Sequence, residues 1–168
     1  MRRLILLRHA KTEPRSEAGD DLSRRLTERG RRDSCRMADV LDGAGYAPDL
    51  VLVSPAVRAR ETWDGMAATF PKAKVELRKG LYDATPEEIE EEMRRETATA
   101  GTVMVVAHNP GLQELAVNLL IDSGGSNSDI EQLSAGCPTA AAAVFAIDEA
   151  GRGYLAALFH ARDHREAL

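Results

Sequence analysis

Cysteine, aromatic residues and long apolar runs are all scarce in this sequence of 168 residues. The two cysteines, Cys35 and Cys137, lie far apart and form no CxxC pair, which favours two reduced thiols and a cytoplasmic protein over a disulfide framework. Every apolar run is shorter than the roughly 20 residues of a membrane span, so no membrane association is expected. The run from Leu4 to Leu7 ends at Arg8, too early for a signal peptide.

Positive charge is also in deficit, since the formal net charge is -5 at pH 7. The surface as a whole therefore does not attract nucleic acid, and no nucleic-acid partner is expected. An anion site in such a chain must be a local concentration of cations. The length suits one domain over residues 1–168, and it leaves the oligomeric state open.

What the sequence does have is a regular alternation of short apolar runs and helical patterns. Strand patterns occupy residues 3–8, 49–53, 74–78 and 102–107, with a hairpin of 139–147 and 154–159. Helices are predicted over 27–44 and from the start signals Ser54-Pro55, Thr85-Pro86 and Asn109-Pro110. Residues 11–25 and 123–128 are expected to be loops. The alternation predicts a three-layer α/β/α sandwich with a mostly parallel central sheet.

Three of the predicted strands end in polar residues suited to binding an anion. The strands run directly into Arg8-His9, Ser54-Pro55 and His108-Asn109-Pro110. Ligands of parallel sheets bind outside the carboxyl ends of the strands, where helix N-termini also present free N–H groups. Two imidazoles and an arginine at one sheet edge therefore predict a phosphate site.

The residues around these strand ends resemble a known family. The segments are Leu6-Leu7-Arg8-His9-Ala10, Ser54-Pro55-Ala56-Val57-Arg58-Ala59-Arg60-Glu61-Thr62 and Val105-Val106-Ala107-His108-Asn109-Pro110-Gly111. In this order they resemble the histidine phosphatase superfamily, also called phosphoglycerate mutase-like, over about residues 3–112. The short length and the segment Leu26-Thr27-Glu28-Arg29-Gly30 are most similar to its small SixA-type phosphohistidine phosphatase branch.

The resemblance implies a phosphoglycerate mutase-like fold and a catalytic set of four residues. His9 would be the nucleophile that forms a phosphohistidine intermediate, which splits one difficult displacement into two easier ones. Arg8, Arg58 and His108 would bind the phosphoryl oxygens, for which planar guanidinium groups are well suited. The implied enzyme is a phosphatase without metal or other cofactor. Its substrate would be phosphohistidine in a protein or a small phosphate ester.

Other interpretations remain open for the same residues. His9 could be a core histidine, His108 a strand-end residue and Arg58 a solvated helix arginine, or the two histidines could bind a metal. Arg60 and Lys11 suit surface positions equally well. Other functions are a mutase, for which the chain has little room to form a lid, a phosphate-binding module without turnover, and a metal-dependent hydrolase that chelators would inactivate.

Two positions depart from the family pattern. Ala10 stands where the family often has glycine, so the chain is expected to leave the strand with ordinary dihedral angles. Larger members have a carboxylic acid that protonates the leaving group, and the local candidate here is Asp83. This residue is equally compatible with a turn. Without an acid, substrates with good leaving groups, such as phosphohistidine, would be favoured.

Overall fold

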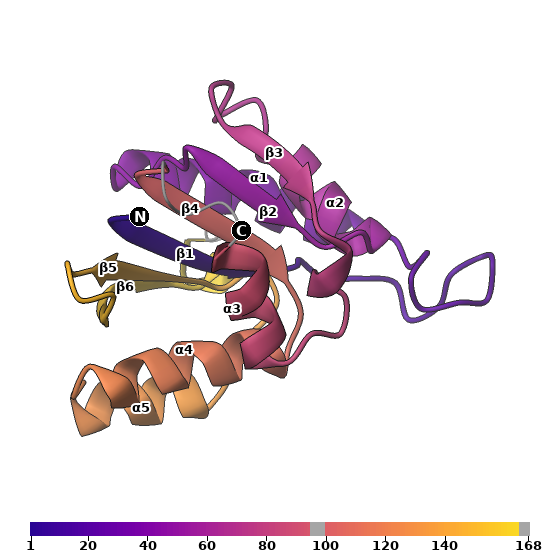
Figure 1. Cartoon of the computed structure of the whole chain (residues 1–168). Helices are drawn as coiled ribbons and strands as arrows, with labels where there is room; N and C mark the ends of the chain where they lie inside the picture. Colours follow the sequence, from indigo (N-terminus) through magenta and orange to yellow (C-terminus); the bar gives the residue numbers. More distant parts are fainter. Residues whose placement is uncertain (95–99, 165–168) are drawn as a thin grey trace.

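The fold is built on one six-stranded sheet with the strand order β3-β2-β4-β1-β5-β6 (Figure 1). The computed structural model describes residues 1–94 and 100–164. The strands are β1 (Arg3–Arg8), β2 (Leu50–Val53), β3 (Lys74–Leu77), β4 (Thr102–Ala107), β5 (Ala142–Ile147) and β6 (Gly153–Phe159). The first four run parallel, and β5 and β6 form an antiparallel hairpin beside β1. The mostly parallel sheet and the hairpin are therefore confirmed.

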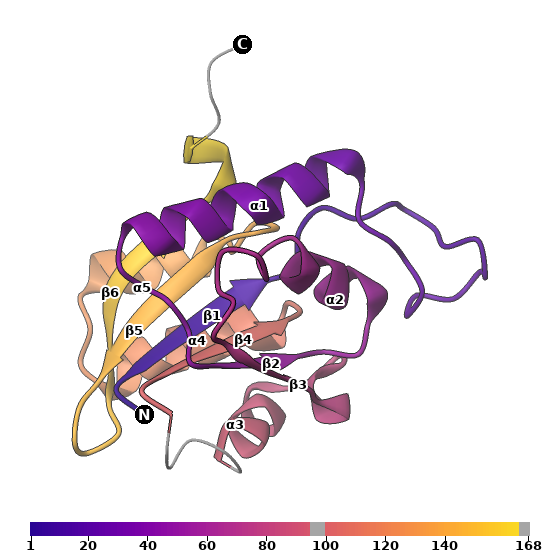
Figure 2. The same ribbon diagram turned by 90° about the horizontal axis from the view of Figure 1, so that it is seen from above.

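Helices cover both faces of this sheet, which confirms the three-layer prediction (Figure 2). One face carries α1 (Glu28–Gly43) and α2 (Val57–Asp64); the other carries α3 (Pro86–Arg94), α4 (Gly111–Asp122) and α5 (Asn127–Ser134). Two short 3-10 helices, η1 (Lys79–Leu81) and η2 (Ala161–His164), follow β3 and β6. Within the described residues, no helix is long and apolar enough to cross a membrane.

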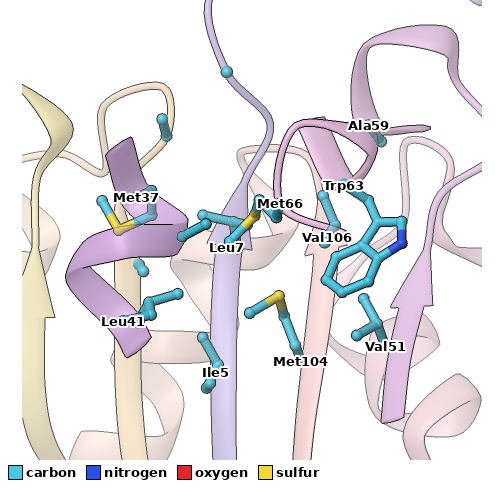
Figure 3. Packing of buried hydrophobic residues seen from close by; sticks show 14 of the residues in the cluster. Ile5, Leu7, Met37, Leu41, Val51, Ala59, Trp63, Met66, Met104 and Val106 are labelled. Carbon is cyan, nitrogen blue, oxygen red and sulfur yellow. The ribbon is translucent and has the colours of Figure 1, made fainter. Parts of the chain in front are cut away.

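Each face of the sheet has its own hydrophobic core because side chains alternate along a strand. On β1, Ile5 and Leu7 face α1 and α2, whereas Leu4 and Leu6 face the other three helices. Figure 3 shows the first core, in which the labelled partners of β1 are Met37, Leu41, Val51, Ala59, Trp63, Met66, Met104 and Val106. Every residue of β2 and β4 is buried, as continuous apolar runs predict for central parallel strands.

Two of the predicted helix starts are wrong, by two residues after β2 and by one residue after β4. After β2 the helix begins at Val57 with Ala56 as its N-cap, and Ser54 instead bonds to His108. After β4 the helix begins at Gly111 with Pro110 as its N-cap, and no side chain caps it. In both cases a polar side chain that could have capped a helix is used by tertiary contacts beside the strand ends.

The predicted loop over residues 123–128 is confirmed for 123–126, but α5 begins at Asn127 and was not predicted. Ser126 is the N-cap of α5, and its hydroxyl accepts a hydrogen bond from the Asp129 backbone N–H. Leu133 is the one fully buried residue of this helix. Its apolar face is too sparse to produce the periodicity by which the other helices were predicted.

Candidate active site

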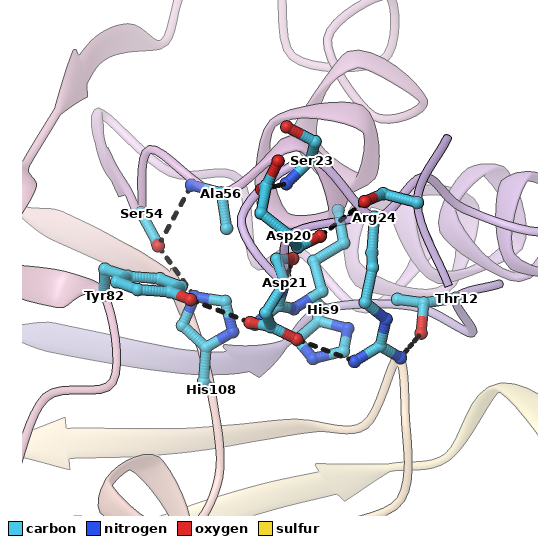
Figure 4. Close-up of polar contacts among 12 residues, drawn as sticks. His9, Thr12, Asp20, Asp21, Ser23, Arg24, Ser54, Ala56, Tyr82 and His108 are labelled. Atoms are coloured by element: carbon cyan, nitrogen blue, oxygen red, sulfur yellow. Dashed lines mark hydrogen bonds and ion pairs between the residues drawn. The ribbon is translucent and has the colours of Figure 1, made fainter. Parts of the chain in front are cut away.

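The carboxyl ends of β1, β2 and β4 lie side by side, and they bring two histidines together. Arg8 pairs with Ala107 across the parallel register, so the residues that follow each strand emerge at the same edge. The ring centroids of His9 and His108 are 5.2 Å apart, with their planes tilted by 54° (Figure 4). Two residues separated by about a hundred positions in the sequence therefore share one site.

His9 is held as a neutral imidazole with one nitrogen available. It is 8% exposed, and its Nδ1 lies 2.8 Å from the carbonyl oxygen of Ala10. Because a carbonyl only accepts hydrogen bonds, Nδ1 carries the proton and Nε2 keeps its lone pair. Burial, with smaller contributions from the charges of Arg58 and Arg8, lowers the pKa of His9 to about 4. The ring is therefore an unprotonated nitrogen base at neutral pH.

His108 is also neutral, and Ser54 orients it. The Ser54 hydroxyl lies 2.7 Å from Nε2, while Nδ1 is buried with no hydrogen-bond partner within the described structure. Burial, followed by the proximity of His9 and Arg58, lowers the pKa of His108 to about 3. When the Ser54 hydroxyl donates to Nε2, the proton of the neutral ring resides on Nδ1. His108 can then offer one N–H to a ligand oxygen.

Two arginines complete the predicted group of four. Arg58, in the first turn of α2, is 4% exposed, and its Nη1 and Nη2 donate to the backbone oxygen (2.7 Å) and carboxylate (2.8 Å) of Asp21. Arg8 donates from Nη1 to the carbonyl of Cys137 at 2.8 Å, and its buried Nε has no partner among the described protein groups. Both guanidinium groups are thus held by the protein in fixed orientations.

The loop between β1 and α1 adds residues that sequence reasoning missed. The Asp21 carboxylate accepts hydrogen bonds from Arg58, from Tyr82 Oη at 2.8 Å and from Arg24 Nη1 at 2.9 Å (Figure 4). Arg24 also donates to Thr12 Oγ1 at 2.5 Å. Burial acts to raise the pKa of Asp21, but hydrogen bonds from Arg24, Tyr82 and Arg58 outweigh it and hold the pKa well below its ordinary value. Asp21 is therefore an anion surrounded by donors.

The other residues considered at the sequence level lie elsewhere. Asp83 is exposed at φ 49°, a left-handed turn position that aspartate tolerates. Arg60 and Lys11 are exposed. Ala10 is buried, its N–H donates to Thr62 Oγ1 at 2.9 Å, and it is not among the described residues with positive φ, so the prediction of ordinary dihedrals is confirmed.

Neither cysteine forms a disulfide, and no metal-binding cluster is present in the described ranges. Cys35 is exposed and Cys137 is buried. Burial raises the pKa of the Cys137 thiol to about 11 although Arg8 lies nearby, so the thiol is protonated at neutral pH. Across residues 1–94 and 100–164, no three His, Cys, Asp or Glu side chains gather closely enough to hold an ion. The site therefore offers cations and imidazoles to an anion.

Comparison with known proteins agrees with this geometry. Residues 4–114 match the model of the histidine phosphatase superfamily (branch 1). An uncharacterized chloroplast protein of Arabidopsis thaliana is 34% identical over 125 residues, which cover 68% of this chain and 57% of that protein. The chain thus spans little more than half the length of that relative. An uncharacterized protein of Mycobacterium tuberculosis is 34% identical over 142 residues, which cover 84% of this chain and 87% of the relative.

Solved structures extend the likeness to the whole described fold. A protein of Agrobacterium tumefaciens whose name assigns it to the SixA phosphohistidine phosphatases superposes with a TM-score of 0.82 at 27% identity. The superposition covers 95% of this chain and 97% of that protein. This agreement confirms the phosphoglycerate mutase-like fold class that the motifs predicted. The chain belongs to branch 1 of the histidine phosphatase superfamily, in its SixA-type group.

Proposed function

We propose that the protein is a metal-independent phosphatase in which His9 is the nucleophile. The observation that carries this proposal is the state of the His9 ring, which is neutral, bonded through Nδ1 to the Ala10 carbonyl and adjacent to the ring of His108. A nucleophile must be unprotonated at working pH, and burial achieves this here without a neighbouring base. The matched family model supports the same reaction class.

The reaction has two displacements at phosphorus. His9 Nε2 forms a P–N bond while the bond from phosphorus to the leaving group breaks, and water then attacks the phosphohistidine and returns the electron pair to Nε2. Arg8, Arg58 and the Nδ1–H of His108 bind the phosphoryl oxygens. Catalysis of phosphoryl transfer rests mainly on such positioning and charge stabilisation. Arg8 Nε and His108 Nδ1, both buried and without a hydrogen-bond partner among the described residues, supply donors for this role.

The substrate we propose is phosphohistidine carried by a protein. The names of the SixA proteins that share this fold at 27% and 28% identity support it. The P–N bond of phosphohistidine is also labile, so its cleavage depends little on how strongly the leaving group is protonated. A small phosphate ester is the competing substrate, and a panel of phosphorylated compounds distinguishes the two.

A substrate panel with EDTA present tests the function. It contains a phosphohistidine peptide, an aryl phosphate, sugar phosphates and nucleotides. We expect turnover of the peptide, and an acid-labile phosphoenzyme that is trapped on rapid quenching and is lost in His9→Ala. His164→Ala, which removes an exposed histidine of η2, is the matched control and keeps the phosphoenzyme. Activity abolished by EDTA, or no phosphoenzyme with any substrate, contradicts the proposal.

A further inference from the structure

The Asp21 carboxylate faces the proposed phosphoryl site but is not one of the groups proposed to bind the phosphoryl oxygens. Three side chains donate to it: Arg58, Tyr82 and Arg24. In Figure 4 it lies between Tyr82 and Arg24, with the rings of His9 and His108 next to it. Its charge is close enough to His108 to act on the pKa of that imidazole. A carboxylate in this place lies beside the proposed nucleophile and the proposed phosphoryl-binding imidazole.

The backbone that carries Asp21 is anchored, so the carboxylate stays at the site when a substrate binds. Arg58 Nη1 holds the Asp21 carbonyl at 2.7 Å, and the Val57 N–H donates to the carbonyl of Leu22 at 3.0 Å. Asp20 Oδ1 accepts from the Ser23 N–H at 2.8 Å and closes the turn. Both sides of Asp21 are therefore tied to the start of α2 or to the loop itself. Only rotation of its own short side chain remains.

We propose that Asp21 is the proton-transfer residue of this site, donating to the leaving group and then accepting a proton from the attacking water. The inference rests on the proposed function. In the first displacement the Asp21 carboxyl proton moves to the leaving atom as its bond to phosphorus breaks and His9 Nε2 bonds to phosphorus. In the second, water attacks phosphorus, its proton moves to the Asp21 carboxylate, and the P–N bond breaks. Asp21 is then protonated in the product complex, and this proton leaves with the inorganic phosphate, so that the free protein regains the ionised carboxylate.

In each cycle the proton that Asp21 donates arrives with the substrate. Asp21 is ionised in the free protein because three donors surround it. A phosphate monoester loses its last proton at a pKa of about 6, so a fraction of it binds as the monoanion at neutral pH. Once bound, the phosphoryl group takes up N–H groups of Arg58 and places negative charge beside Asp21. Both changes raise the affinity of Asp21 for that proton.

Asp83, the acid considered from the sequence, has no such placement. It follows Tyr82 directly, but it is an exposed turn residue, whereas the Tyr82 hydroxyl reaches Asp21. The local sequence places an acid next to the tyrosine, and the fold supplies a different acid from a distant loop. Asp83 is thus a matched control, since asparagine also tolerates its left-handed conformation.

The test compares Asp21→Asn with Asp83→Asn on two substrates. With 4-nitrophenyl phosphate the leaving group needs little protonation, whereas a simple alkyl phosphate releases an alkoxide that does. General acid catalysis contributes about 10²–10⁴-fold, so we expect Asp21→Asn to lower kcat/KM for the alkyl ester by about that factor. The loss with the aryl ester is about 10-fold or less, and Asp83→Asn leaves the ratio of the two substrates unchanged. In the wild type, the kcat/KM for the alkyl ester divided by that for the aryl ester falls as the pH rises above about 6. In Asp21→Asn this ratio does not depend on pH.

Each other outcome overturns the inference. Equal losses of kcat/KM on both substrates would show that Asp21 only orients Arg58. Tighter binding of inorganic phosphate and faster turnover by Asp21→Asn would show that the Asp21 carboxylate competes with the substrate. Binding of inorganic phosphate by the variant establishes that its site is folded. A wild type that hydrolyses the aryl but not the alkyl ester also contradicts it. A wild type inert toward every substrate overturns the proposed function itself, and this inference with it.

Discussion

The strand ends and the loops contribute opposite kinds of groups to one site. His9 and His108 follow β1 and β4, are almost fully buried, and are neutral because burial disfavours their charged forms. Asp21 and Arg24 come from the loop before α1, where the Asp21 side chain is 45% exposed and ionised. Burial therefore determines the charge of the strand-borne residues, and ion pairing determines that of the loop-borne carboxylate.

This difference determines how the two groups can respond to a ligand. The strand-borne side chains are set by the register of a packed sheet and cannot shift without disturbing its core. The loop-borne side chains are held mainly by one another and by Arg58, so a phosphoryl group that competes for Arg58 changes their bonding directly. The proposed nucleophile and oxygen-binding positions are thus rigid, whereas the bonding of Asp21, and with it its proton affinity, is expected to respond to a ligand.

With 4-nitrophenyl phosphate as the substrate, we expect a larger effect from a strand-borne residue than from the loop. His108→Asn removes the imidazole that packs against His9 and whose buried Nδ1 has no hydrogen-bond partner in the part of the chain that the structure describes. Because this donor acts on developing charge, we expect kcat to fall by about 10²–10³-fold, as for a lost oxyanion donor. Steady-state kinetics with 4-nitrophenyl phosphate at saturating concentration measures it.

For comparison, Arg24→Gln tests a loop-borne residue in the same kinetic assay. Glutamine can keep a hydrogen bond to Asp21 or Thr12, and Arg24 is partly exposed, so a loss of about 10-fold or less is expected. A larger loss for Arg24→Gln than for His108→Asn would break the distinction between the rigid and adjustable groups. Equal thermal unfolding midpoints in both variants keep the comparison free of folding effects.

The strand-borne half of the site could be predicted from the sequence because its signals are local. A buried parallel strand appears as a continuous apolar run, and the residues that end β1 and β4 emerge at one edge whenever the strands are parallel. Arg8, His9 and His108 were found in this way, and Arg58 by its motif. The start of α2 was misplaced because Ser54 is used by His108, a contact over 54 positions that local capping rules do not include.

The loop-borne half could not be predicted, since nothing local distinguishes Asp21 from its neighbours. Asp20 has the same chemistry one position earlier, yet its carboxylate closes a turn with Ser23. The selection of Asp21 depends on the position of Arg58, which the packing of α2 determines. The sequence signal that points toward Asp21 is the cluster of charged residues in a long loop directly after the proposed nucleophile. Such a loop predicts a functional role for the segment, but it does not identify which of its residues has that role.

The strand-borne histidines also predict a pH dependence of stability. Their folded pKa values, about 4 and about 3, lie below the ordinary value near 6.5, so the unfolded chain binds protons that the folded protein does not. The free energy of unfolding is therefore expected to fall by a few kcal/mol as the pH drops from about 7 to about 4.5. Urea unfolding at these two pH values measures it, and His9→Gln is expected to show a smaller decrease.

The range from about pH 7 to pH 4.5 separates the contributions of the strand-borne histidines and the loop-borne carboxylate to stability. Asp21, whose pKa is lowered, stabilises the folded state above the ordinary aspartate pKa of about 3.9, and that contribution is lost only as the pH falls below it. Between about pH 7 and pH 4.5 the Asp21→Asn variant should therefore keep the wild-type slope. If Asp21→Asn flattens the slope and His9→Gln does not, the assignment of neutral histidines and an ionised carboxylate is wrong.

The smallest effect we expect is that of Tyr82→Phe, which sharpens the description of the loop-borne group. The change removes the Oη–H donor to Asp21 and keeps the ring that contacts His108 edge-on at 5.7 Å. Loss of a donor to the charged form raises the pKa of Asp21, but Arg24 and Arg58 still hold it below the ordinary value. Carbon-13 NMR titration of the Asp21 carboxyl should show this upward shift, with kcat/KM for 4-nitrophenyl phosphate changed less than about 5-fold, in line with one modest hydrogen bond. An unchanged midpoint would mean that the hydroxyl contributes nothing to the charge of Asp21, and that the two arginines alone keep this carboxylate ionised.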